Sequence, residues 1–488
     1  MNDVAQETSG TGSSSDHTMA RGTILLMMAT VLFIGSGYII HLVMARVISA
    51  DEYGRFGVLL AMLQVIQVFL LKGIPDSVNK YVAEGRDTAQ IKSIAIRTQG
   101  MFSIGICVLL ILAAPFISDL LNDRDMAPFI MMIALIIPIR AIFSVYSGYV
   151  RGMRRFRDAG FLSNVNSASR VLFVLLFLGL GLGIQGAIGG YIAAAILSLF
   201  MGYRYSMGDI EGPDVTSSEV VHFGLPIIIY SACYLAIMNI DLLIAKALVS
   251  NPDSIGHYTA ARLLASLILS ATMALQLTLF PSISQSVSRD DHVQTRNYIN
   301  GSMRYVLMAL VPLSILLGIF SEQILTFLFP SEYSAGADSL SILGTAISFI
   351  AILILFGTIL NGAGHPKLSA TITFILVILS IPLNYFLISE HGIVGGAMAM
   401  FILGGVGMLT FAFFVHRNFG TIVNIRSLLR IFGAGTVMGI IAYLIEPTTA
   451  TVVPMSAVLL MINIGLLFLF REVGDEDIKI VKALIGRS

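Results

Sequence analysis

Four basic side chains lie inside long apolar stretches of this chain, where a charge is costly. They are Lys72, Arg140, Arg170 and Arg262. One cation at the centre of a membrane-spanning helix costs about 2.5–3.5 kcal/mol, so four cost roughly 10–14 kcal/mol unless water or counter-ions compensate them. Guanidinium groups also bind phosphate oxygens through two parallel hydrogen bonds. The four cations therefore predict a hydrated, positively charged cavity that accepts an anion.

Acidic residues that could neutralise these cations are fewer. Asp241 lies in the seventh apolar stretch, and Asp76 lies near the inner end of the second. The alternative to the cavity is that Arg262 pairs with Asp241, while the other cations reach toward the interface or bond to helix carbonyls. For a single residue both interpretations stay open, and the group of four favours the cavity. His41, in the first stretch, is expected to form a hydrogen bond between helices.

These residues belong to fourteen apolar stretches, each about long enough to cross a bilayer. Hydrophobic residues make up 56% of the chain, charged residues make up 12%, and the mean hydropathy is +0.87. The hydrophobic share and the mean hydropathy are above those of soluble domains, and the charged share is below theirs, so the sequence predicts an all-α polytopic membrane protein. We expect transmembrane helices at residues 22–48, 55–78, 95–118, 127–150, 160–182, 186–205, 219–249, 255–284, 300–328, 335–361, 368–388, 393–415, 427–445 and 452–470.

The distribution of basic residues predicts the orientation of the chain. With a cytoplasmic amino terminus, 21 of the 29 basic residues fall on the inner side of the membrane. Only four fall on the outer side: Arg46, Arg55, Arg124 and Lys246. Basic residues concentrate on the cytoplasmic side of membrane proteins. The sequence therefore places both termini in the cytoplasm of a multi-pass protein of the cell membrane.

The chain also contains an internal repeat. The stretch MARVISADEYGRFG from Met44 is echoed by IAKALVSNPDSIGHYTAA from Ile244. A second pair is YSGYVRGMRRFRDAGF from Tyr146 followed by GIQGAIGGYIAA, and FGTILNGAGHPKLSA from Phe356 followed by GIVGGAMAMFI. Six expected helices separate the copies, and an even number keeps the repeats in the same orientation. This pattern predicts two parallel six-helix lobes around a central cavity, plus two extra helices.

The expected domains follow from this repeat. Lobes of this kind rock against each other and open the cavity to one side at a time, as in transporters. The amino-terminal lobe holds the first six helices, the carboxy-terminal lobe the next six, and the last two helices follow. A disordered tail precedes the helices, and an amphipathic cytoplasmic tail ends the chain. The boundaries are 1–21, 22–206, 217–417, 425–470 and 471–488.

The sequence argues against several other classes of protein. It has no nucleotide-binding Gly-Lys-Ser/Thr loop, no His-Glu-x-x-His motif, no serine-elbow motif and no loop large enough for a catalytic domain. We therefore expect neither an enzyme nor a membrane-embedded glycan ligase. The 29 basic and 29 acidic residues balance, which gives no indication of a nucleic acid partner. Only Cys107 and Cys233 could form thiolate sites, and both lie in apolar stretches, so we expect no metal or other cofactor.

Five motifs in register carry a resemblance to a known family. They are ARVISADEYGRFG from Ala45, YVRGMRRFRDAG from Tyr149, MNIDLLIAKALVS with GHYTAARLLAS from Met238, LFPSIS from Leu279 and LNGAGHPKLSA from Leu360. With these motifs the chain resembles the polysaccharide exporters and O-antigen flippases of the multidrug/oligosaccharidyl-lipid/polysaccharide exporter superfamily. The resemblance implies movement of a lipid-linked oligosaccharide from the inner to the outer leaflet. The polyprenyl tail would stay in the lipid, and the phosphate-sugar head would cross through the cavity.

The resemblance also leaves an alternative open. Drug-exporting members of the superfamily use carboxylates within the membrane, and Asp241 beside Asn239 is the best-matched acid here. A cation-coupled multidrug exporter, with Asp241 and Asn239 at the coupling site, is therefore the second hypothesis. The expected partners are a lipid-linked oligosaccharide, membrane lipid and glycosyltransferases of the same pathway.

Overall fold

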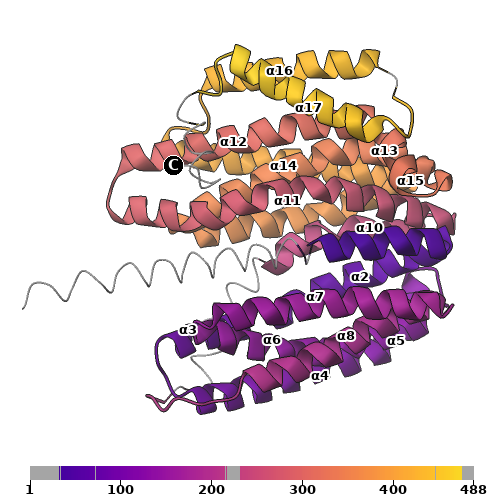
Figure 1. Ribbon diagram of the computed structural model, residues 1–488, viewed down its shortest axis with the longest axis vertical. Coiled ribbons are helices and arrows are strands. Elements are labelled where there is room, and N and C mark those ends of the chain that lie inside the picture. The colour runs from indigo at the N-terminus through magenta and orange to yellow at the C-terminus, as the bar shows by residue number, and fades with distance from the viewer. Residues whose placement is uncertain are drawn as a thin grey trace, which may run out of the picture. The chain divides into compact units, whose positions relative to one another are not determined.

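The computed structural model describes residues 32, 34–71, 73–214, 216, 231–445, 447–474 and 477. All regular elements among these residues are helices (Figure 1). Ten of the described helices are long and apolar enough to cross a membrane. The all-helical, polytopic fold is thus confirmed, whereas the number of fourteen transmembrane helices stays a prediction. The chain divides into two compact units, Met1–Leu235 and Ala236–Ser488.

The first unit is organised around α6 (Ile136–Gly152), which packs against α2, α3, α4, α7 and α8. Two glycines on α6 permit close approach to α3. A Cβ at Gly148 would lie 2.5 Å from the Pro75 carbonyl oxygen, and one at Gly152 would lie 2.7 Å from Cβ of Val82. The other helices of this unit are Ile34–Val47, α2 (Ala50–Leu71), α3 (Ile74–Ala83), α4 (Thr88–Leu120), α5 (Met126–Ala134), α7 (Phe156–Gly179) and α8 (Gly183–Tyr205).

The second unit is organised around α14 (Ala337–Gly362). This helix is apolar on all sides, which is typical of a helix surrounded by others. It packs against α11, α12 and α15, and α16 packs on the far side of α12 (Figure 1). The other elements of this unit are α10 (Ile240–Leu248), α11 (Pro252–Ser288), α12 (His292–Ile319), α13 (Ser321–Leu328), the 3-10 helix η1 (Ser331–Gly336), α15 (Pro366–Phe419), α16 (Ile425–Leu444) and α17 (Val452–Leu469).

Several expected helices are interrupted in the structure. The stretch 55–78 divides between α2 and α3 because Gly73 adopts φ 79° and ψ −90°, a conformation that favours glycine. The stretch 300–328 divides at Phe320 into α12 and α13. The element α15 covers both of the expected helices 368–388 and 393–415. Gly392, which lies between them, has the non-helical angles φ 55° and ψ −136°. The chain therefore turns at Gly392, and two helices meet there.

The internal repeat has matching local geometry in the two units. The Arg154 amide donates to the Arg151 carbonyl at 2.9 Å, and the Gly364 amide donates to the Asn361 carbonyl at 3.2 Å. Both donor residues have positive φ, 56° and 85°. Further along each copy, Gly183 and Gly392 have φ of 54° and 55°. The paired sequence motifs thus fold into paired turns, while the domain boundaries and the two-lobe cavity stay predictions.

Candidate functional site

Two of the predicted cavity cations lie together in the first unit. Arg170, on α7, is buried, and its Nη2 donates to Oγ of Ser36 at 2.5 Å. Its guanidinium carbon lies 5.6 Å from the centroid of the Tyr191 ring on α8, a cation–π distance. Arg140, on α6, is partly buried, and its positive charge is repelled by that of Arg170. α6, α7 and α8 therefore bring two cations and one aromatic ring into a single site.

His41 extends this site toward α2. Its Nδ1 lies 3.0 Å from the hydroxyl of Tyr53, so the predicted hydrogen bond between helices is confirmed. The His41 ring centroid lies 5.8 Å from that of Phe56, and Phe56 in turn lies 5.8 Å from Tyr191. The charge of Arg170 also acts on His41. We call the group of His41, Arg140, Arg170 and Tyr191 the unit-1 basic cluster.

Arg140 differs from Arg170 in its contacts. Within the described part of the chain, Arg140 has no hydrogen bond and no ion pair. A guanidinium that is partly removed from water and faces a second cation is electrostatically unfavourable until water or an anion approaches it. The unit-1 basic cluster is therefore suited to bind an anionic group.

Arg262 lies in the second unit and has an internal counter-ion. Its Nε lies 3.2 Å from Oδ2 of Asp241, and its Nη2 donates to the Met238 carbonyl. The Tyr258 hydroxyl donates to the same Asp241 oxygen at 2.7 Å. Asp241 and Tyr258 are buried. The sequence left two interpretations open for Arg262, a cavity cation or an ion pair with Asp241, and the structure contains the ion pair.

The surroundings of Asp241 bear on the predicted coupling site. Asn239 is buried and immediately precedes α10, whose first turn contains Asp241. Oδ1 of Asp241 is buried and has no hydrogen-bond partner among the described residues. Among the described residues, no group of three or more His, Cys, Asp or Glu side chains could hold a metal ion. The roles of Asp241 and Asn239 in ion coupling stay predictions.

The structure places the predicted cavity cations differently from one another, and their role in substrate binding stays a prediction. Lys72 lies outside the described residues. Arg140 and Arg170 come together, whereas Arg262 belongs to the other unit. The sequence missed Tyr258 and Tyr191 as partners of the charged side chains. Tyr258 precedes Arg262 by four residues and therefore shares its helix face, which could have been recognised from spacing alone.

A further group of charged residues, also missed, joins the carboxy-terminal segment to α12. Nη1 and Nη2 of Arg304 donate to the Asp477 carboxylate at 3.0 and 2.8 Å, and Nε donates to Glu472 at 2.7 Å. Tyr305 donates to Asp477 at 2.7 Å, and Nη1 of Arg430 lies 3.4 Å from Glu472. The hydrogen bonds from Arg304 hold the pKa of Asp477 well below its usual range. We call these five residues the carboxy-terminal ion cluster.

Three curated relatives of the chain are named as flippases or transporters. The probable low-salt glycan biosynthesis flippase Agl15 of Haloferax volcanii is 22% identical over 459 residues, which cover 87% of this chain and 94% of that protein. The putative O-antigen transporter of Shigella flexneri is 20% identical and covers 73% and 88% of the two chains. The lipid II flippase MurJ of Bacillus subtilis is 22% identical and covers 88% of each.

Solved structures share the fold. The lipid II flippase MurJ in an inward closed conformation matches with a TM-score of 0.73 and 15% identity, over 93% of this chain and 98% of that chain. A MATE family multidrug resistance transporter in an inward-facing conformation matches with a TM-score of 0.69 and 12% identity, over 83% and 98%. At these identities the likeness concerns the fold alone.

Two family models match the sequence. The model described as "MatE" matches residues 226–386. The model described as "Polysaccharide biosynthesis protein" matches residues 19–287, which is more than half of the chain. The resemblance drawn from the five sequence motifs is thereby confirmed. This chain belongs to the polysaccharide biosynthesis protein family.

Proposed function

We propose that this protein is a flippase that moves a lipid-linked oligosaccharide from the inner to the outer leaflet by alternating access. Its family membership supports this function, as do relatives that are named a glycan biosynthesis flippase, an O-antigen transporter and a lipid II flippase. The substrate has a polyprenyl tail, which stays in the lipid, and an anionic phosphate-sugar head, which must cross the apolar layer. The protein lowers the barrier for the head and changes no covalent bond.

The observation that carries this proposal is the unit-1 basic cluster. Arg140 and Arg170 place two guanidinium groups within one helix bundle, and Arg140 has no ion pair among the described residues. A phosphate can accept two parallel hydrogen bonds from one guanidinium, and the hydrogen bonds are stronger because both partners are charged. Binding of the head group therefore removes the repulsion between the two cations. Lys72 is proposed to contribute to the same anion-binding surface.

The proposed architecture has fourteen transmembrane helices, in two six-helix lobes and one carboxy-terminal pair. The lobes enclose a hydrated cavity and rock to expose it to each leaflet in turn. Both termini lie in the cytoplasm, and glycosyltransferases on that side supply the substrate. The matching turns at Gly183 and Gly392 support the duplication on which this architecture rests.

The cation-coupled exporter is less well supported. The "MatE" match and the MATE fold likeness favour it. However, a coupling cation would need the Asp241 carboxylate, and that carboxylate is already hydrogen-bonded by Tyr258 and paired with Arg262. A cation bound to this carboxylate would have to share it with the positive charge of Arg262, which repels a second cation.

A reconstituted flipping assay tests the proposal. The protein is inserted into liposomes that contain a lipid-linked oligosaccharide, and a membrane-impermeant glycosidase reports how fast the sugar reaches the outer surface. We expect Arg140→Gln and Arg170→Gln each to slow flipping about tenfold, because each removes a charge-assisted hydrogen bond to the head group. The double variant should show no flipping above that of protein-free liposomes.

Matched controls separate this function from its alternative. Arg124→Gln removes a cation from an exposed surface ion pair with Asp119 and should leave flipping unchanged. Wild-type flipping by the double variant would refute the assignment of Arg140 and Arg170. Asp241→Asn should leave glycan flipping measurable, whereas loss of drug resistance in cells that carry this variant would favour the exporter.

A further inference from the structure

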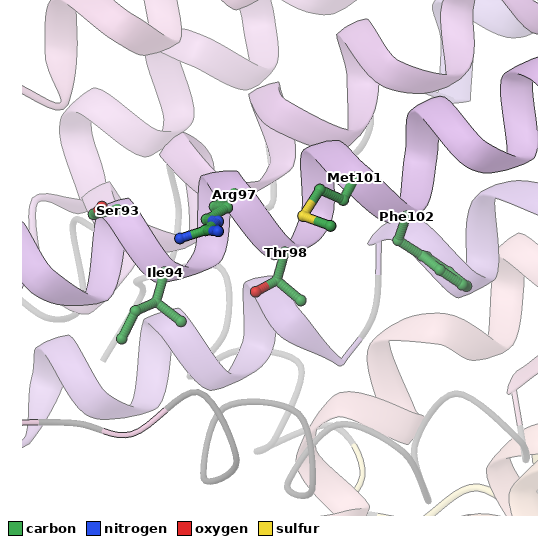
Figure 2. Close-up of a pocket in the computed structure, with 6 residues that line it drawn as sticks. All are labelled: Ser93, Ile94, Arg97, Thr98, Met101 and Phe102. Carbon is green, nitrogen blue, oxygen red and sulfur yellow. The ribbon is translucent and has the colours of Figure 1, made fainter.

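A groove of about 600 Å³ follows one face of α4 in the first unit. Figure 2 shows the six residues that line it, Ser93, Ile94, Arg97, Thr98, Met101 and Phe102. Three of the four side chains at one end of the groove are polar, with Ile94 among them, and Met101 and Phe102 at the other end are apolar. This groove contains no residue of the unit-1 basic cluster and is a separate feature of the surface.

The position of Arg97 along α4 corresponds to the level of lipid head groups. From Met101 to Ser118 the helix has no charged side chain. Eighteen helical residues span about 27 Å, close to the thickness of the hydrocarbon core. Arg97 lies one helical turn before this segment begins. Its side chain is exposed and makes no hydrogen bond or ion pair with any residue of the described ranges.

The apolar end of the groove continues along the membrane-facing side of α4. Met101 and Phe102 are 68% and 49% exposed, and Leu109, Leu112 and Phe116 follow on the same helix as exposed side chains. Gly105 lies one turn beyond Met101, and a Cβ built there would meet no atom of the described residues within 4 Å. The absence of a side chain at Gly105 leaves a shallow notch between its neighbours. An extended hydrocarbon chain can lie along such a surface.

We propose that this groove is a binding site for an anionic phospholipid. Arg97 pairs with the phosphate, the Ser93 and Thr98 hydroxyls donate to head-group oxygens, and one acyl chain follows Met101 and Gly105. A zwitterionic lipid fits less well, because its own ammonium group competes for the phosphate and is repelled by Arg97. In the proposed orientation the site faces the inner leaflet. The inference depends on the membrane location of the protein and not on its transport function.

Native mass spectrometry of the purified protein in a neutral detergent tests this site. The protein is titrated with phosphatidylglycerol or with phosphatidylcholine that has the same acyl chains, and the bound lipid is counted. We expect tighter binding of phosphatidylglycerol. Arg97→Gln should weaken that binding roughly fivefold, the effect of one basic residue at an anionic membrane surface. Arg97→Lys should retain most of it, because the charge remains.

Two further variants make the test specific. Arg204→Gln removes another exposed cation of the same unit, in the last turn of α8, and should leave phosphatidylglycerol binding unchanged. Gly105→Leu fills the notch without disturbing the helix and should weaken binding while Arg97 stays in place. The proposal is overturned if Arg97→Gln binds phosphatidylglycerol as tightly as wild type does. It is also overturned if Arg204→Gln weakens phosphatidylglycerol binding as much as Arg97→Gln does. Full displacement by inorganic phosphate, or binding of polyprenyl phosphate alone, would likewise overturn it.

Discussion

Individual charges in the two units are stabilised in different ways. Arg262 forms an ion pair with the buried Asp241, and the Tyr258 hydroxyl donates to the same oxygen. Removal of one member of such a pair leaves a buried charge without a counter-ion and costs about 3–5 kcal/mol. Arg140 has no comparable partner in the described ranges. A partly buried cation without a counter-ion is suited to a site that binds and releases an anion.

The carboxy-terminal ion cluster makes stability depend on pH. Because Arg304 holds the pKa of Asp477 below its usual value of about 4, the stabilising interaction is fully present above that pH. It is lost as the pH falls through the lowered pKa, where the folded protein takes up the proton. Asp477→Asn should cost about 1–3 kcal/mol at pH 7, as expected for hydrogen bonds to a charged group. Thermal unfolding in detergent at pH 7, and at a series of pH values from about 4 downward, measures both effects.

Glu390→Gln is the control for this pH dependence. Glu390 is exposed and has no ion pair among the described residues, so its replacement should leave the unfolding temperature unchanged at every pH. If Asp477→Asn unfolds at the wild-type temperature at pH 7, the cluster contributes no stability.

Residues that act locally were predictable from the sequence, and residues that meet across long separations were not. Arg140 and Arg170 were predicted as site residues because a cation within an apolar stretch is costly and is therefore typical of a functional site. Arg304 and Asp477 are 173 residues apart, and nothing in the sequence near either one indicates the other. From the sequence, Arg304 is only one of the 21 basic residues expected on the cytoplasmic side.

At the scale of helices, the turns are set by a few glycines with positive φ. Gly183 begins α8, and Gly392 divides α15, which as one straight helix of 54 residues would measure about 81 Å. That length is more than twice the thickness of the hydrocarbon core. The turn at Gly392 therefore allows the chain to reverse and cross again.

Substitution of these glycines tests their role. Gly183→Ala and Gly392→Ala each place a Cβ on a left-handed backbone and should cost about 1–2 kcal/mol, seen as a lower unfolding temperature in detergent. Gly465→Ala is the matched control. Gly465 lies within α17, and a Cβ there meets no atom within 4 Å, so alanine should raise helix stability slightly. Equal unfolding temperatures for all three variants would contradict this account.

The helices were largely predictable, and their interruptions were not. Apolar stretches of about 20 residues identify membrane helices because the bilayer offers no other partner for backbone polar groups. Gly73 and Phe320 end helices within such stretches, where hydropathy does not change. Glycine is also common in uninterrupted membrane helices, so the residue type alone does not mark a turn.

At the scale of the whole molecule, the charge distribution predicts a single orientation. Asp125, which precedes α5, should face outward, and Asp290, between α11 and α12, should face the cytoplasm. Their side chains are 81% and 91% exposed, so cysteines at these positions should react readily. In a background without Cys107 and Cys233, a membrane-impermeant maleimide should label Asp125→Cys in intact cells. Asp290→Cys should be labelled only after the membrane is permeabilised.

The reverse labelling pattern would place both termini outside and would invert the proposed direction of transport. Labelling of both positions in intact cells would mean that an even number of spans separates them, and not the five of the proposed topology. Neither result would alter the family membership, which rests on the match to residues 19–287.

The ion pair between Asp241 and Arg262 has a consequence for biogenesis. The two residues lie on consecutive helices, α10 and α11, joined by a short connection at Val249–Asn251. Either helix alone would carry a charge into the lipid at about 2.5–3.5 kcal/mol on insertion scales. As a hairpin, the two helices can leave the translocon with their charges already neutralised. The pair thus favours insertion of α10 and α11 together.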